Sequence, residues 1–159
     1  MTEIRLREST YVDDAEISGY LTRLVGRMAV HLEGVRPNFE VFALRDPTLN
    51  AFAMPGGFIG VHTGLILAAQ SESELASVLA HEMSHVTQHH LARSIAPQQQ
   101  AQTAAMLAMA VAILAARNRP DLAMGAVASG QAAAVQSQLS YSRDFEREAD
   151  RMGLALLER

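Results

Sequence analysis

Residues 78–90, VLAHEMSHVTQHH, constrain this chain more than any other stretch. They hold four of its six histidines, and Glu82 directly follows His81 among apolar neighbours. Histidines four residues apart lie on one face of an α-helix, so His81 and His85 can offer two nitrogen ligands to one metal ion. The alternative is a packed helix that happens to carry histidines. That alternative leaves Glu82 ionised and buried without a partner, which is costly, so we favour a metal site.

The residues around this motif predict a long helix. Ser71, followed three residues later by Glu74, has the form of an N-terminal capping box. We expect the helix to run to about Arg93, and we expect Pro97 to end it or to separate it from the next element. On such a helix His89 lies one turn beyond His85 and reaches toward the cleft, whereas His90 is turned away.

Glu82 and the metal together predict hydrolytic chemistry. Because Glu82 comes one residue after His81, it points beside the metal and not at it. There it can take a proton from a metal-activated water and later pass it to the leaving amine. This is the chemistry of a zinc peptidase.

A third protein ligand is needed, because catalytic zinc takes three protein ligands and keeps one position for water. The chain has no cysteine, so the third ligand must be His, Asp or Glu, and residues 142–150 are the candidate region. On a helix Glu146 and Asp150 share a face, and Glu148 points elsewhere. Glu146 would bind the metal and Asp150 would orient a ligand histidine. A solvated charged surface explains the segment equally well, and His89 and Glu148 are the next candidates.

The rest of the N-terminal half predicts a small sheet between helices. Hydrophobic periodicity indicates helices at 13–33, 63–69 and 142–158 and strands at 39–44, 51–54 and 58–61. Zinc peptidases often bind an extended substrate along an edge strand. Phe58–Val61 is a candidate edge, with Gly56, Gly57 and Gly60 admitting close approach. A tight turn around these glycines is the alternative.

Residues 98–138 differ from the rest in composition, being rich in Ala, Met and Gln. The apolar runs 103–116 and 122–135 are each shorter than the roughly twenty residues that span a bilayer. We expect a helical hairpin inserted in a single domain that covers residues 1–159. The alternative is a surface that contacts a membrane or an apolar client.

Charge and cysteine content exclude several partners. The net charge is −4 without a basic cluster, so nucleic acid is not an expected partner. The absence of cysteine excludes a disulfide framework. The N-terminus, MTEIRLREST, has no apolar signal-peptide core. We expect either a cytoplasmic protein or a chain whose targeting segment is absent.

Three motifs carry a resemblance to a known family. They are NAFAMPGG followed by VHTGL at residues 50–65, SELA running into HEMSH at 73–85, and Glu146-x-x-x-Asp150 in an READRxG setting. Together they resemble the gluzincin metallopeptidases related to the CAAX prenyl endopeptidase and the membrane heat-shock protease. The resemblance implies zinc, with Glu146 as the third ligand. Tyr141 and Arg143 lie just before that ligand, and their position makes them candidate contacts to the substrate or the oxyanion.

HVTQHHLAR and the Ala/Met-rich hairpin resemble one branch of that family most. Its members are periplasmic, carry tandem helical repeats after the protease domain and degrade misassembled outer-membrane β-barrel proteins. The resemblance implies a periplasmic or membrane-associated bacterial protein, outer-membrane protein substrates and contact with assembly machinery through 98–138. A repeat domain and a leader are not seen in this chain, which ends at Arg159.

We therefore predict an α+β fold. It is a mainly helical zincin-like domain with a small, mostly antiparallel sheet and the His-Glu-x-x-His helix in its core. The predicted activity is zinc-dependent endopeptidase hydrolysis by His81, Glu82, His85 and Glu146, with Asp150 in support. Two other functions stay open: a zinc-binding, chaperone-like module with latent proteolysis, and a membrane-associated interaction module.

Overall fold

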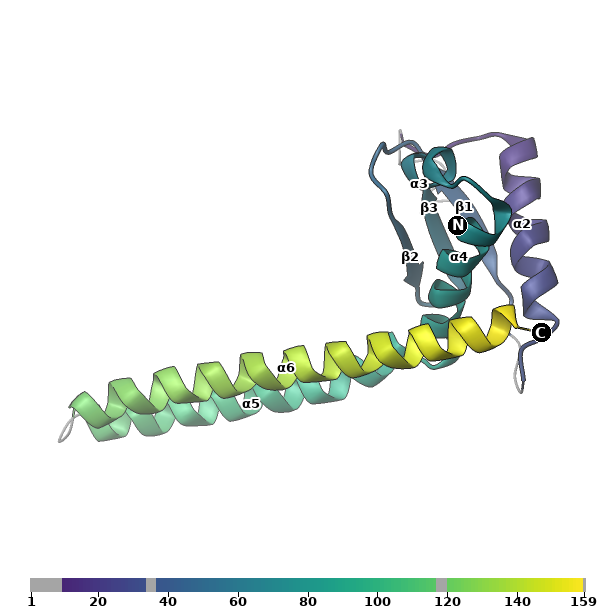
Figure 1. Cartoon of the computed structure of the whole chain (residues 1–159). Coiled ribbons are helices and arrows are strands. Elements are labelled where there is room, and N and C mark those ends of the chain that lie inside the picture. The colour runs from purple at the N-terminus through teal and green to yellow at the C-terminus, as the bar shows by residue number, and fades with distance from the viewer. Residues whose placement is uncertain (1–9, 34–36, 117–119, 159) are drawn as a thin grey trace. The chain divides into compact units, whose positions relative to one another are not determined.

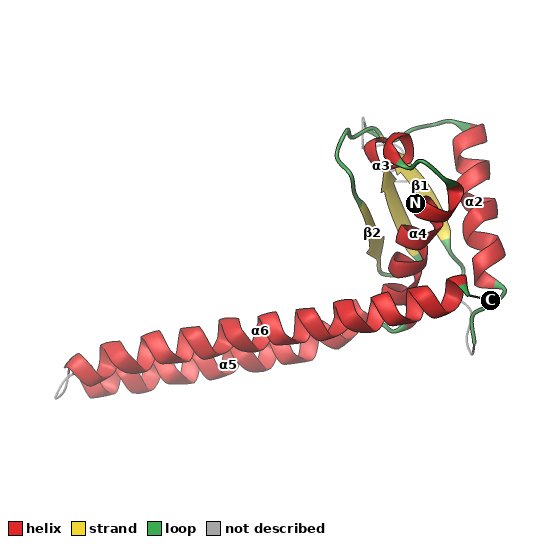
Figure 2. Cartoon of the chain, in the orientation of Figure 1, coloured by secondary structure: helices red, strands yellow, loops and turns green. Residues whose placement is uncertain are grey.

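The structure is a computed structural model of the chain, and it describes residues 10–33, 37–116 and 120–158. The chain forms two compact units, Met1–His90 with Arg147–Arg159, and Leu91–Glu146. The first combines helices with a three-stranded sheet, and the second consists of two helical segments, as Figure 1 shows. Figure 2 shows the predominance of helix over strand. The prediction of a mainly helical α+β fold with a small sheet is confirmed.

The sheet of the first unit has the strand order β1-β3-β2. Its strands are β1 (Glu40–Leu44), β2 (Ala51–Met54) and β3 (Phe58–His62). Strand β3 pairs in parallel with β1 and antiparallel with β2. The sheet is therefore mixed, and the expectation of a mostly antiparallel sheet is corrected. The reason is that the chain leaves β1, forms β2 at the far edge, and returns through a turn into the centre. Phe58–Val61 is thus central, and β2 is an edge strand.

One face of this sheet packs against two helices, α2 (Ala15–Ala29) and α4 (Glu72–Thr87). Alternate strand residues point to the same face, and the register places Val41 beside Ile59 and Ala43 beside Val61. All four belong to the buried core. The helices contribute to that core Leu21, Leu24, Val25, Met28, Leu75, Ala76, Leu79, Ala80 and Met83. Figure 1 shows both helices beside the strands. The helix that carries the histidines is thus fixed to the sheet.

The opposite face carries aromatic side chains. Phe42 is buried, and its ring meets the ring of Phe52 edge to face, with the centroids 6.3 Å apart. Both residues oppose Gly60 on the central strand. A Cβ atom at Gly60 would lie 2.4 Å from the Phe52 ring. A side chain at Gly60 would therefore force the Phe52 ring to move, whatever else Gly60 does.

Side-chain caps begin both core helices, and the cap at Ser71 is the one predicted from the sequence. The carboxylate of Asp14 accepts hydrogen bonds from the backbone N–H groups of Glu16 and Ile17. The hydroxyl of Ser71 accepts one from the N–H of Glu74 at 3.3 Å. These bonds satisfy donors that have no partner inside a helix. A short helix, α3 (Thr63–Ala68), lies between β3 and α4.

Two long helices meet in the second unit. They are α5 (His90–Ala116) and α6 (Pro120–Leu157), and their parts within Leu91–Glu146 run side by side (Figure 1). The expectation that Pro97 ends a helix is wrong, because α5 continues across it although proline donates no backbone hydrogen bond. Residues 142–158 are also not a separate helix but the end of α6. Within the described residues no helix is both long and apolar enough to cross a membrane.

Candidate metal centre

The side chains of His81 and His85 converge on the same face of α4. Their Nε2 atoms lie 3.0 Å apart. Tetrahedral zinc with Zn–N bonds of about 2.0–2.1 Å holds two ligand nitrogens roughly 3.3 Å apart. Two unprotonated ring nitrogens at such a distance repel each other unless a proton or a cation lies between them. The spacing therefore fits two ligands of one metal ion.

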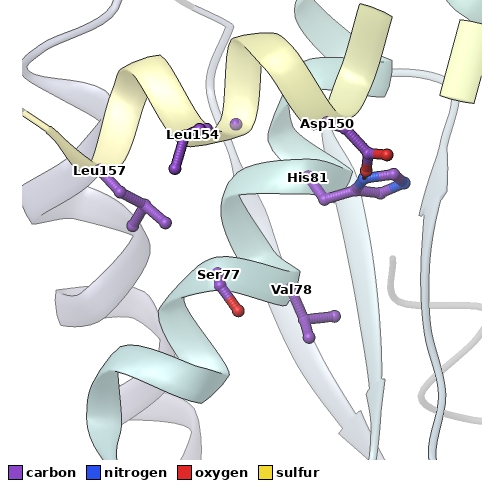
Figure 3. Close-up of a pocket in the computed structure, with 7 residues that line it drawn as sticks. Ser77, Val78, His81, Asp150, Leu154 and Leu157 are labelled. Carbon is purple, nitrogen blue, oxygen red and sulfur yellow. Dashed lines mark hydrogen bonds and ion pairs between the residues drawn. The ribbon is translucent and has the colours of Figure 1, made fainter. Parts of the chain in front are cut away.

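The far nitrogen of His81 has a carboxylate partner from the end of α6. Nδ1 of His81 lies 2.8 Å from Oδ1 of Asp150, and Figure 3 shows the two side chains together. A carboxylate accepts hydrogen bonds, so Nδ1 carries the proton and Nε2 of the neutral ring keeps its lone pair. Asp150 is 73% exposed, so solvent screens the contact, and its main effect is to orient the ring. This is the geometry expected for the proposed supporting role of Asp150.

Helix α6 reaches α4 at this point because Gly153 has no side chain. A Cβ atom at Gly153 would lie 3.1 Å from the backbone nitrogen and 3.2 Å from Cα of His81. Next to this contact is a pocket of about 420 Å³, lined by His81, Asp150 and mainly apolar side chains that include Val78 and Leu154. Figure 3 shows these residues around the pocket. Gly153 thus fixes the distance between the two helices that carry His81 and Asp150.

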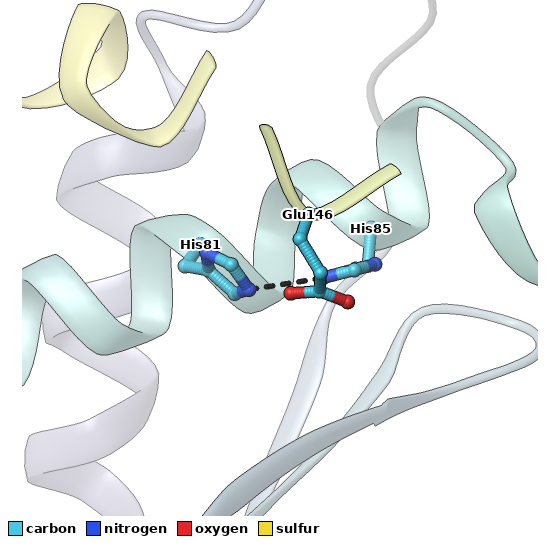
Figure 4. A group of neighbouring side chains, drawn as sticks. All are labelled: His81, His85 and Glu146. Carbon is cyan, nitrogen blue, oxygen red and sulfur yellow. Dashed lines mark hydrogen bonds between the residues drawn. The ribbon is translucent and has the colours of Figure 1, made fainter. Parts of the chain in front are cut away.

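Glu146 completes a set of three candidate ligands. One ligand atom from each of His81, His85 and Glu146 can be chosen so that all lie within 4.8 Å of one another. Figure 4 shows the Glu146 carboxylate facing the two imidazoles. Two nitrogens and one carboxylate oxygen are the donor set of many catalytic zinc sites. Glu146 is the last residue of the second unit, and the next residue, Arg147, belongs to the first.

The predicted extension of the histidine helix to Arg93 is wrong. Helix α4 ends at Thr87, and His89 has a φ of 54°. This left-handed conformation is rare outside glycine, although histidine is among the residues that adopt it more readily. No Gly or Pro marks the break in the sequence, so the apolar pattern favoured one continuous helix.

The break changes the predicted position of His90. His89 is exposed, whereas His90 is 3% exposed and begins α5. Nδ1 of His90 lies 3.0 Å from Nδ1 of His85. The expectation that His90 turns away is therefore wrong, whereas a reach of His89 toward the cleft stays a prediction. Glu148, expected to point elsewhere, places Oε2 at 3.3 Å from Nε2 of His90.

The glycines proposed to admit substrate have structural reasons of their own. Gly56 and Gly57 have φ angles of 90° and 88° in the turn between β2 and β3. A Cβ atom at Gly57 would also lie 2.5 Å from the carbonyl oxygen of Asn38. Phe58 begins the central strand. Contact of these residues with substrate stays a prediction.

The remaining predicted residues lie on α4 and α6. Glu82 is partly buried on α4, one residue after His81. Arg143 is exposed on α6, and the side chain of Tyr141 lies outside the described part of the chain. The roles predicted for all three stay predictions.

Comparison with known proteins adds independent information. The model of peptidase family M48 matches residues 15–159. The chain is 42% identical over 146 residues to a putative beta-barrel assembly-enhancing protease of Vibrio cholerae, covering 92% of this chain and 30% of that protein. It is 36% identical over 148 residues to the beta-barrel assembly-enhancing protease of Escherichia coli, covering 93% and 30%. It is 35% identical over 127 residues to the mitochondrial metalloendopeptidase OMA1 of Arabidopsis thaliana, covering 80% and 23%.

Proposed function

The chain belongs to peptidase family M48, and on this premise we propose that it is a metalloendopeptidase domain with a zinc ion held by His81, His85 and Glu146. The observation that carries the proposal is the 3.0 Å separation of the two histidine Nε2 atoms on α4. The chain spans about 30% of the length of the Vibrio cholerae and Escherichia coli relatives. The zinc, when bound, lowers the pKa of a water molecule toward neutrality and polarises the scissile carbonyl.

Glu82 is the proposed general base and general acid. A turn holds 3.6 residues, so its side chain leaves α4 about 100° around the axis from His81. The carboxylate accepts a proton from the attacking water as the new C–O bond forms. It donates that proton to the amine as the C–N bond breaks. Asp150 keeps His81 in the tautomer that leaves Nε2 free for the metal.

The substrate backbone is proposed to pair with β2. This strand has a neighbour on one side only within the described sheet, and α4 packs beside it. An extended peptide can add to such an edge through backbone hydrogen bonds. We place the substrate along Ala51–Met54, because Phe58–Val61 is central and has no open edge.

The proposed role is quality control of envelope proteins, and the proposed location is the periplasm. The support is similarity to proteins named for enhancing β-barrel assembly. By the same similarity, the proposed substrates are misassembled outer-membrane proteins. The hairpin is proposed to contact a membrane or assembly machinery, because α5 and α6 expose large apolar side chains, Met106, Leu107, Met109, Val135 and Leu139. Co-sedimentation with liposomes tests the membrane contact.

Cleavage of an unfolded protein substrate by the zinc-loaded chain tests the proposed activity. Glu82→Gln should lose about 10²- to 10⁴-fold in rate, the usual contribution of a general acid–base group, while it retains zinc. Glu74→Gln is the matched control, because it makes the same change in the first turn of the same helix. Equal rates for Glu82→Gln and the unaltered chain would refute the assignment. If neither cleaves while both bind zinc, a zinc-binding module with latent proteolysis is the better description.

A further inference from the structure

The second ligand histidine has a support that the sequence did not indicate. His90 is almost fully buried, with 3% of its surface exposed. Its Nδ1 lies 3.0 Å from Nδ1 of His85, and its Nε2 lies 3.3 Å from Oε2 of Glu148. The second contact is at ion-pair distance but is not an aligned hydrogen bond. These atoms form a continuous path from a carboxylate to the metal-facing ring.

The direction of the hydrogen bonds along this path follows from the chemistry of imidazole. A neutral ring carries one hydrogen, on either Nδ1 or Nε2. If Nε2 of His85 binds metal, its hydrogen is on Nδ1, and that N–H donates to His90. Nδ1 of His90 must then accept, so the hydrogen of His90 is on Nε2. That nitrogen lies 3.3 Å from the carboxylate of Glu148, which can only accept.

We propose that His90 and Glu148 are positioning residues that hold His85 in its metal-binding orientation and tautomer. The inference rests on the proposed function, since it assumes that His85 binds the metal. Each ligand histidine then has a carboxylate behind it. Asp150 orients His81 directly, and Glu148 orients His85 through His90. The left-handed backbone at His89 turns His90 into this position, which gives the helix break a function.

Zinc affinity of the metal-free chain, measured by competition with a chromophoric chelator, tests the proposal. His90→Phe keeps the bulk of the ring but removes the acceptor. His90→Asn keeps an acceptor, because its amide oxygen is as many bonds from the backbone as Nδ1. His89→Asn is the control at the exposed neighbour, because asparagine also adopts the left-handed backbone that His89 has. Loss of a residue that orients a metal ligand weakens binding by about 10- to 100-fold.

We expect this loss of zinc affinity for His90→Phe, and a zinc affinity close to that of the unaltered chain for His90→Asn and His89→Asn. Glu148→Ala should weaken zinc binding in the same direction. Circular dichroism of each metal-free variant shows whether it is folded. Equal zinc affinity for folded His90→Phe and His89→Asn would overturn the proposal while leaving the metal site intact. No zinc binding by the unaltered chain would instead refute the proposed function.

Nitrogen NMR of the zinc-bound chain gives a second readout. At about pH 8, where unperturbed imidazole is neutral, the spectra should show hydrogen on Nδ1 of His85 and on Nε2 of His90. Hydrogen on Nδ1 of His90 would contradict the proposal, because that atom could not then accept from His85.

Discussion

Substitution of Gly153 by alanine tests the contact that joins α6 to the histidine helix. The added Cβ would lie 3.1–3.2 Å from backbone atoms of Ala80 and His81. Backbone atoms inside a helix cannot rotate away as the end of a side chain can, so α6 must shift by a few tenths of an ångström. Overpacking of this kind costs about 1–3 kcal/mol. The shift would also lengthen the 2.8 Å contact between Asp150 and His81.

Gly26→Ala on α2 provides the matched control. Nothing lies within 4 Å of a Cβ atom added there, and Gly26 is likewise near the end of its helix. Alanine in place of a helical glycine stabilises by about 0.5–1 kcal/mol. The helix-propensity gain is common to both changes, so the difference between the two variants gives the packing cost of Gly153→Ala alone.

Urea unfolding of both variants measures that difference. We expect Gly26→Ala to raise the free energy of unfolding and Gly153→Ala to fall below it by about 1–3 kcal/mol. Equal free energies of unfolding would refute the reasoning, since they would show that α6 does not press on the backbone of His81.

Two further predictions concern pH and metal. Two hydrogen bonds from Thr48 hold the pKa of Asp46 below its usual value, the larger effect coming from the side-chain hydroxyl and the smaller from the backbone N–H. Because Asp46 is ionised at neutral pH, both bonds stabilise the folded chain there. Thr48→Val should lower the free energy of unfolding at neutral pH, and urea unfolding across pH should show this difference vanishing as the pH falls through the lowered pKa of Asp46. Chelation should destabilise the zinc-loaded chain by about 2.7 kcal/mol if free zinc was 100 times its dissociation constant. Chelation should therefore lower the melting temperature of the unaltered chain and leave that of a His81→Ala, His85→Ala double variant unchanged. An equal fall in the two proteins would contradict the assigned ligands.

The strands and the start of α4 were predictable because local signals specify them. Ser71 and the alternation of apolar residues around Val41 and Ile59 act within a few positions. The order of strands was not predictable, because pairing β1 with β3 is a long-range choice that no local residue encodes. The mixed sheet follows from that choice, and so does the placement of Phe58 in the centre.

The convergence of His81 and His85 was predictable because helical spacing alone brings the two rings together. The support from His90 and Glu148 was not, because it depends on a helix break at His89 without glycine or proline. His89 was the only local hint, since histidine enters the left-handed region more often than most residues. Pro97 led to the opposite error. A proline usually marks a helix boundary, but α5 continues through Pro97.

Metal content of the purified chain tests the central claim most directly. The measurement is zinc per chain by plasma mass spectrometry after reconstitution and desalting. Glu146→Ala is compared with Asp144→Ala, which removes the same charge two residues away on α6. We predict about one zinc per chain in the unaltered protein and in Asp144→Ala, the count for a mononuclear catalytic site, with much less in Glu146→Ala. Zinc retained in Glu146→Ala would contradict the third ligand, and no zinc in the unaltered chain would contradict the metal centre itself.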